Sequence, residues 1–187
     1  MIIKPDASSD EYSSPFFKLN EKFCSEFESF IAEKNGEVKG KYNAWSYAIY
    51  GKIRDPKTWT LKYKKSTFTS SGNLLLSSKS QSLLVLAEWT TKRIENSNSD
   101  FKIRKKNTTD FIKLNIGSKL KLLEVSKKYV IELENEKPNF LKKIIEITKE
   151  LFEKKEIYII ELKNGILKIE LRTENHYFEI FNELAKI

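Results

Sequence analysis

The chain has 187 residues, is 40% hydrophobic and carries a formal net charge of +8. This length suits one domain or two small ones, and the clustered apolar residues exclude a chain that is disordered throughout. The apolar runs are too short to cross a bilayer, and the N-terminus lacks the apolar core of a signal peptide. Cys24, the single cysteine, excludes an intrachain disulfide and suits a reducing compartment, so we expect a soluble, cytoplasmic protein.

Positive charge is concentrated in two segments of the chain. Lys34–Lys65 holds eight lysines and one arginine against two acids, and Lys102–Lys128 has the same counts. If the two segments share one face, that face suits phosphate groups, an anionic membrane or an acidic protein. The alternative is a lysine-rich solvated surface, since 26 acids accompany 34 cations in the whole chain.

The N-terminal region predicts an arm followed by a helix. Residues 1–14 are polar and turn-rich, and we expect a flexible N-terminal arm. Ser14 is the candidate N-cap of a helix with Pro15 at its first position, and Asn35-Gly36 predicts its end. Apolar residues at spacings of three and four predict a buried stripe made of Phe16, Leu19, Phe23, Phe27, Phe30 and Ile31.

The segment 40–63 interleaves aromatic residues with cations, which is typical of either a base-stacking platform or a hairpin core. A five-residue turn at 53–57 pairs Ile49 with Leu61 and separates two faces. The face predicted to be buried carries Trp45, Tyr47, Ile49, Gly51, Trp59, Leu61 and Tyr63. The other face carries Ser46, Ala48, Tyr50, Lys52, Thr60, Lys62 and Lys64. The pattern favours a hairpin core, and it leaves Tyr50 among the lysines as the candidate for stacking.

The middle of the chain is less distinct. Leu83–Thr91 fits a buried strand or a helix, and the β-prone Trp89-Thr-Thr91 favours the strand. The polar run Asn96–Asp100 is the best candidate boundary between two halves. A short strand at Phe101–Ile103 and a short helix capped by Thr108 or Thr109 and ending near Gly117 follow.

The last third of the chain has the clearest patterns. Residues 120–133 are strand-like, and Pro138 starts a helix with a buried stripe of Leu141, Ile144, Ile145, Thr148, Leu151 and Phe152. Asn164-Gly165 predicts a two-residue hairpin turn, which pairs Leu162 with Leu167 and Glu161 with Lys168. A final helix is expected at about 175–186, where it buries Tyr177, Phe178, Phe181 and Leu184.

These elements predict an α+β fold with an N-terminal helix, antiparallel sheet or sheets with hairpins, and two further main helices, one of them C-terminal. We expect residues 15–187 to form a single α+β domain, with two subdomains split near 95–100 as the alternative.

The sequence shows no catalytic, cofactor-binding or metal-binding constellation. Glycine is scarce and forms no phosphate-binding loop, and His176 is the only histidine, so we expect no enzymatic activity, no cofactor and no metal site. The most specific functional feature is the row Lys102, Arg104 and Lys106. Their alternation along a strand predicts that the three side chains lie on the same outer side, where they could contact phosphates. The alternative is a charged edge strand that resists edge-to-edge pairing. The candidate anion or nucleic-acid contacts are Tyr50, Lys52, Lys62, Lys64, Lys102, Arg104 and Lys106.

Residues 101–181 also carry loose hydrophobic motifs: Phe101-Lys-Ile-Arg, Phe140-Leu-Lys-Lys-Ile-Ile before Glu156-Ile-Tyr-Ile-Ile, Asn164-Gly-Ile-Leu-Lys-Ile and Phe178. In these motifs the segment resembles the C-terminal part of an uncharacterised bacterial membrane-associated family, a domain of unknown function. Members of that family usually have transmembrane helices upstream, which this sequence lacks, so the resemblance implies no activity.

Taken together, these features predict a soluble, non-enzymatic binding module that acts through a protein partner, as an adaptor or as an inhibitor or immunity-type protein. One alternative is nucleic-acid binding through a basic face, which would require the two basic segments to converge. Another is peripheral binding to an anionic membrane surface.

Overall fold

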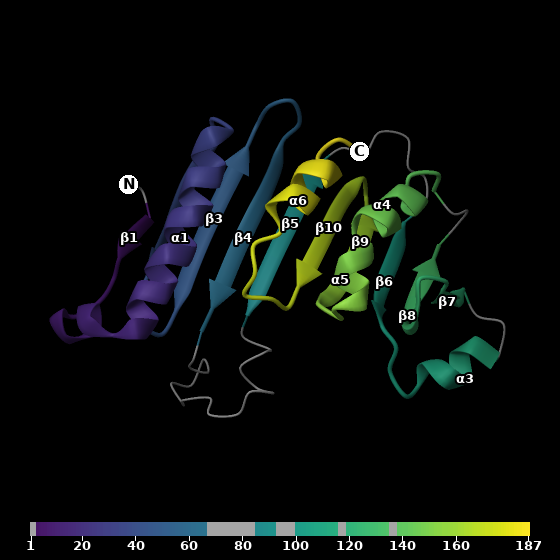
Figure 1. Ribbon diagram of the computed structural model, residues 1–187. Helices are drawn as coiled ribbons and strands as arrows, with labels where there is room; N and C mark the ends of the chain where they lie inside the picture. The colour runs from purple at the N-terminus through teal and green to yellow at the C-terminus, as the bar shows by residue number, and fades with distance from the viewer. Residues whose placement is uncertain (1–2, 67–84, 93–99, 116–118, 135–137) are drawn as a thin grey trace. The chain divides into compact units, whose positions relative to one another are not determined.

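The computed structural model describes residues 3–66, 85–92, 100–115, 119–134 and 138–187 (Figure 1). The chain divides into two compact units: unit 1 comprises Met1–Trp89 and Arg172–His176, and unit 2 comprises Thr90–Leu171 and Tyr177–Ile187. The described residues form ten strands and five α-helices, which confirms the α+β class. The strands are not all antiparallel as predicted, because β1 and β2 run parallel. Most of the boundary predicted near 95–100 lies outside the described residues.

Unit 1 is a sheet with one long helix on its face. Its strands follow the order β1 (Ile3–Pro5), β2 (Glu37–Tyr42), β3 (Tyr47–Ile53), β4 (Trp59–Lys65) and β5 (Leu86–Lys92), of which the last three residues of β5 belong to unit 2. The 3-10 helix η1 (Ser9–Ser13) and helix α1 (Pro15–Glu33) connect β1 to β2. Helix α1 lies across one face of these strands (Figure 1). The strand expected within residues 83–91 is therefore confirmed as β5.

The N-terminal segment differs from the flexible arm that we expected. Ile3 is fully buried and pairs with Gly40 in a parallel ladder with β2. Ser8 and Glu11 then form a reciprocal capping box at η1. The sequence signal for β1 is weak because the strand has three residues, one of which, Pro5, lacks an amide hydrogen.

Helix α1 begins as predicted but buries a neighbouring stripe. The Ser14 side chain accepts a hydrogen bond from the Phe16 amide, with Pro15 at the first position. The inward residues are Phe17, Asn20, Cys24, Phe27, Phe30 and Ile31, whereas Phe16 and Leu19 are 55% and 63% exposed. The prediction of these two as core residues was wrong. Asn20 can face inward because its Nδ2 donates to the Asn43 carbonyl at 2.8 Å.

The β3–β4 hairpin has the predicted faces but a different register. Ile49 pairs with Tyr63, and Gly51 pairs with Leu61, so the turn lies one residue later than we placed it. Moving the turn by one residue changes the partner of each β3 residue by two positions on β4. Because side chains alternate along a strand with a period of two, each residue stays on its predicted face. Trp45 is an exception: it precedes β3 and is 44% exposed, although we expected it in the core.

Unit 2 is an antiparallel sheet with short helices. Its strands follow the order β10 (Ile166–Leu171), β9 (Ile157–Lys163), β6 (Phe101–Lys105), β8 (Ser126–Leu133) and β7 (Leu120–Leu123). Helix α3 (Asp110–Asn115) joins β6 to β7, and α4 (Leu141–Ile147), α5 (Lys149–Glu153) and α6 (Phe178–Leu184) follow. Helices α4 and α5 lie on one face of these strands (Figure 1). No helix within the described ranges is both long and apolar enough to span a membrane.

Unit 2 confirms the predicted hairpin and corrects three other elements. Asn164 and Gly165 have φ angles of 51° and 73°, as a type I′ turn requires, and Glu161 pairs with Lys168. Residues 120–133 form two strands rather than one. The helix expected from Pro138 begins at Leu141 and is divided at Thr148, and the last helix begins at Phe178.

Candidate functional site

Three neighbouring strands of unit 1 present a polar sheet face, which we call the lysine face. Its nine positions form three cross-strand rows: Glu37–Lys52–Thr60, Lys39–Tyr50–Lys62 and Lys41–Ala48–Lys64. Side chains of cross-strand partners point to the same side of a sheet, so the β2–β3 and β3–β4 pairings show that these nine residues lie on one face. All nine residues are exposed or half-buried.

The lysine face points away from helix α1. Most of the alternate residues of the same strands are buried, although Gly40 is half-buried. Gly51 on β3 lies so close to α1 that a Cβ atom there would be 2.5 Å from Ile31 Cδ1. Phe27 of α1 and Tyr63 of β4 also pack edge to face, with ring centroids 5.6 Å apart. The helix therefore covers the apolar side and leaves the lysines on the other.

The charge of this face is positive and only partly balanced. Lys62 pairs with Glu88 of β5 at 2.7 Å, and Lys41 pairs with Asp6 at 2.7 Å. Among the described residues, no carboxylate lies within ion-pair distance of the other three lysines, Lys39, Lys52 and Lys64. Glu37, the only acid among the nine positions, is engaged by Arg54. Three ammonium groups therefore remain available to an anionic ligand.

Tyr50 is the only aromatic residue of the nine and occupies the central position. Lys39 and Lys62 are its direct neighbours on β2 and β4. Lys39 Nζ lies 5.3 Å from the centroid of the Tyr50 ring, within the range of a cation–π contact. Proteins that bind single-stranded nucleic acids also combine basic side chains with aromatic rings on which bases stack.

A small hollow lies at the Lys41–Ala48–Lys64 row and extends toward Asn43, Ser46 and Ser66 at the strand ends, so that Tyr50 does not line it. Its volume is about 150 Å³, and its lining includes Asp6 as well as all three residues of that row. Ala48 contributes only a methyl group to this lining, between two long lysines. The hollow is large enough for several water molecules or a phosphate group.

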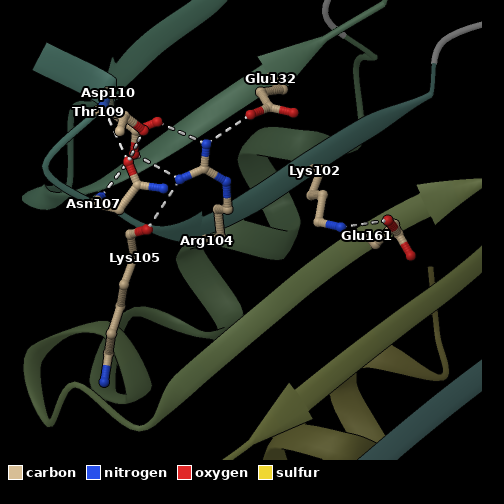
Figure 2. A network of polar contacts seen from close by, with 8 residues as sticks. All are labelled: Lys102, Arg104, Lys105, Asn107, Thr109, Asp110, Glu132 and Glu161. Carbon is tan, nitrogen blue, oxygen red and sulfur yellow. Dashed lines mark hydrogen bonds and ion pairs between the residues drawn. The ribbon is translucent and has the colours of Figure 1, made fainter. Parts of the chain in front are cut away.

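In unit 2 the candidate residue Lys102 lies in a row of cross-strand neighbours whose charges alternate in sign. Lys102 on β6 stands between Glu132 of β8 and Glu161 of β9, and Glu161 faces Lys168 of β10. Lys102 Nζ lies 3.2 Å from Glu161 (Figure 2). Each cation in this row has an acidic cross-strand neighbour, so this face is close to neutral.

Arg104 is held by two carboxylates (Figure 2). Its guanidinium donates to both oxygens of Asp110, at 2.6 and 2.8 Å, and to Glu132 at 2.8 Å. Asp110 is fully buried, and the bonds from Arg104 lower its pKa to about 2. If Arg104 moved to bind a phosphate, the buried carboxylate of Asp110 would lose its partner, which costs about 3–5 kcal/mol. Arg104 is therefore a structural cation of unit 2.

The same network corrects the predicted cap of α3. Asn107 accepts the Asp110 amide proton at 3.0 Å, and the Asn107 amide donates to the Asp110 carboxylate at 2.7 Å. Thr109, one of our two candidate caps, instead donates its hydroxyl proton to Asn107. Asn107 and Asp110 thus cap the helix reciprocally, and Arg104 joins that cap to β6.

The structure brings together four of the seven candidate residues and adds two that the sequence analysis missed. Tyr50, Lys52, Lys62 and Lys64 share the lysine face, whereas Lys102, Arg104 and the exposed Lys106 belong to unit 2. The missed contributors are Lys39 and Lys41 of β2. The alternation from Glu37 to Tyr42 could have revealed this strand, but Gly40 interrupts its apolar positions.

Cys24 and His176, the residues most readily associated with catalysis, both have packing roles. Burial raises the pKa of the Cys24 thiol to about 12, so the thiolate is scarce at neutral pH. His176 stacks on Phe23 with ring centroids 3.9 Å apart, and burial lowers its pKa. Within the described ranges, no three His, Cys, Asp or Glu residues cluster closely enough to hold a metal ion.

Comparison with protein-family models, curated proteins and solved structures gave no match. The resemblance of residues 101–181 to a membrane-associated family stays a prediction. The lysine face holds the largest group of unpaired cations among the described residues that the two ladders bring to one side of a sheet.

Proposed function

We propose that the protein is a non-enzymatic binding module that binds nucleic acid through the lysine face of unit 1. The observation that supports this proposal is the central row, in which Tyr50 stands between Lys39 and Lys62 on the sheet face opposite α1. Lysines supply the phosphate contacts that dominate nucleic-acid affinity, and an aromatic ring supplies a stacking surface.

The composition of the face favours nucleic acid over an anionic membrane. Peripheral membrane binding combines lysines with apolar side chains that enter the acyl boundary. The nine positions of the lysine face contain no aliphatic side chain larger than alanine. The five lysines and the single tyrosine of this face are therefore better suited to bind phosphates and bases than to insert into a lipid surface.

The test is fluorescence anisotropy of labelled oligonucleotides of about 16 nucleotides, a length that covers one binding module. The titrations use wild-type protein and the variants Lys64→Glu and Lys143→Glu. Lys143 is exposed on α4 of unit 2, so the second variant makes the same charge change at a residue that is not part of the lysine face. We expect sub-micromolar binding by wild type and by Lys143→Glu at about 0.15 M salt, and at least tenfold weaker binding by Lys64→Glu.

Two results would argue against this proposal. Equal loss of affinity in both variants would mean that only net charge matters. Binding that disappears at physiological salt in the wild-type protein would mean that the positive charge is generic. Anionic and neutral vesicles in a co-sedimentation assay provide the membrane comparison; vesicle binding that Lys64→Glu abolishes, without oligonucleotide binding, would favour the membrane alternative.

A second observation favours the protein-partner function. Phe16 and Leu19 project outward from the start of α1, and Trp45 lies beside them, with its ring centroid 6.2 Å from that of Phe16. Tyr12 is also about half exposed. Exposed aromatic and aliphatic side chains gathered in this way are typical of protein interfaces, where aromatic residues are enriched.

The double variant Phe16→Ser/Leu19→Ser separates this function from nucleic-acid binding. Both side chains are more than half exposed, so we expect the fold to persist. If a protein partner docks on this patch, a stoichiometric complex captured from native cells by wild type and by Lys64→Glu should be lost in the double variant. Recovery of the same complex with all three proteins would exclude the patch as the docking surface.

A further inference from the structure

We infer that the ligand of the lysine face is a single-stranded nucleic acid, with one base stacked on Tyr50 and a neighbouring phosphate between Lys41 and Lys64. This inference rests on the proposed function and specifies its substrate class. It follows from three features of the face: the position of the ring, the hollow at the Lys41–Ala48–Lys64 row and the width of the sheet.

The ring position provides the site for a base. Tyr50 lies in the middle of three strands, and the residue beside it along β3 on the same face is Ala48. The methyl group of Ala48 leaves that side of the ring uncrowded. Lys39 Nζ lies over the ring, 5.3 Å from its centroid, so a base that stacks on this side would displace that ammonium group. A base that stacks here would have ammonium groups on either side to receive its phosphates.

The hollow at the Lys41–Ala48–Lys64 row provides the site for a phosphate. Ala48 and Tyr50 are two residues apart on one strand, so their side chains emerge about 6.6–6.8 Å from one another. Asp6 also lines the hollow and pairs with Lys41 at 2.7 Å. A bound phosphate would compete with the Asp6 carboxylate for Lys41, so Asp6 limits the affinity of this position.

The width of the sheet argues against a duplex. Unit 1 has five adjacent strands, and four spacings of about 4.8 Å give about 19 Å, which exceeds the major-groove width of about 12 Å. The whole sheet of unit 1 is therefore too wide to enter a groove as a helix or a two-stranded ribbon does, although the lysine face itself occupies only its three middle strands. In a duplex the bases are also paired and stacked on one another, so none would be available to Tyr50.

The experiment compares Tyr50→Ala and Tyr50→Phe with wild-type protein. The three ligands are a single-stranded oligonucleotide, prepared as DNA and as RNA, a blunt duplex, and heparin as a polyanion without bases. We expect Tyr50→Ala to weaken single-strand binding about 5- to 150-fold, the range of a lost base stack, and Tyr50→Phe to stay within about twofold of wild type. Binding of the duplex and of heparin should be weaker in the wild-type protein and unchanged in both variants.

A second variant tests the phosphate position without changing any of the lysines, by removing the carboxylate that pairs with Lys41. Asp6→Asn takes away the competing carboxylate, and we expect it to tighten single-strand binding several-fold while leaving the fold intact, since the Asp6 side chain is 58% exposed. Weaker or unchanged binding by Asp6→Asn would overturn the placement of a phosphate in the hollow.

The outcomes also separate this inference from the proposed function. If wild-type protein binds none of the three ligands, both are overturned. If it binds duplex as tightly as single strand, or if Tyr50→Ala has no effect while Lys64→Glu weakens binding, the single-strand inference is overturned and nucleic-acid binding stands. Circular dichroism of each variant identifies any loss of binding that comes from unfolding.

Discussion

Arg104 joins strand β6 to the start of helix α3 by donating two hydrogen bonds to the fully buried carboxylate of Asp110. Replacing the acid by asparagine would leave the guanidinium facing a neutral amide with only one acceptor oxygen, which Arg104 and the Asn107 amide would then have to share. We expect Asp110→Asn to lower the free energy of unfolding by about 3 kcal/mol. Urea unfolding measures this loss, and a matched Glu132→Gln variant, whose carboxylate is 43% exposed, should lose much less. Equal losses would mean that burial of the acid is unimportant.

The same pair makes the stability of the protein depend on acid. The pKa of Asp110 is about 2 in the folded protein and near 3.8 in the unfolded chain, because Arg104 stabilises the charged form. A lowered folded pKa contributes stability that is present above the unfolded value and is lost as pH falls toward 2. We therefore expect wild-type protein to lose stability between about pH 5 and pH 2 more steeply than Asp110→Asn. Parallel pH profiles for the two proteins would contradict this linkage.

Gly51 permits the close approach of helix α1 to β3. A methyl group at this position would lie 2.5–2.9 Å from side-chain atoms of Ile31 and Phe27, inside van der Waals contact. We expect Gly51→Ala to destabilise the protein by about 1–3 kcal/mol, the usual cost of overpacking a core. Thermal and urea unfolding provide the measurement. Ala48→Thr adds atoms to the same strand on the lysine face, and it should leave stability nearly unchanged.

The salt dependence of nucleic-acid binding should locate the phosphate contacts. Lys52 and Lys64 lie on the lysine face without an ion-pair partner among the described residues, whereas Lys102 is paired with Glu161. The slope of log K against log salt is negative, and for single strands each lost phosphate contact makes it less steep by about 0.7. We expect the double variant Lys52→Gln/Lys64→Gln to have a slope that is less steep by about 1.4, and Lys102→Gln to have the slope of wild type. A larger change with Lys102→Gln would transfer the site to unit 2.

The sequence by itself determined the local elements whose signals lie within a few neighbouring residues. Ser14-Pro15 fixed the start of α1, because a cap needs only its own side chain and the next amide. Asn164-Gly165 fixed the turn and register of the β9–β10 hairpin, because few residues adopt two consecutive positive φ angles. The faces of β3 and β4 were also predictable, since a strand alternates with a period of two regardless of its exact register.

Only the tertiary structure decided which surfaces those elements share. The buried stripe of α1 depended on Asn20 finding carbonyl partners at Asn43 and Ala44, and Phe16 and Leu19 were left exposed as a result. The basic segments have similar charge in sequence, but Arg104 and Lys102 meet carboxylates brought from β8, β9 and α3. Lys39 and Lys41 instead join Tyr50 on the lysine face. The number of charges in a segment is visible in the sequence, but whether they are neutralised depends on which strands pair with that segment. This pairing distinguishes the lysine face from the row of Lys102, Glu132, Glu161 and Lys168 in unit 2, where the charges are balanced.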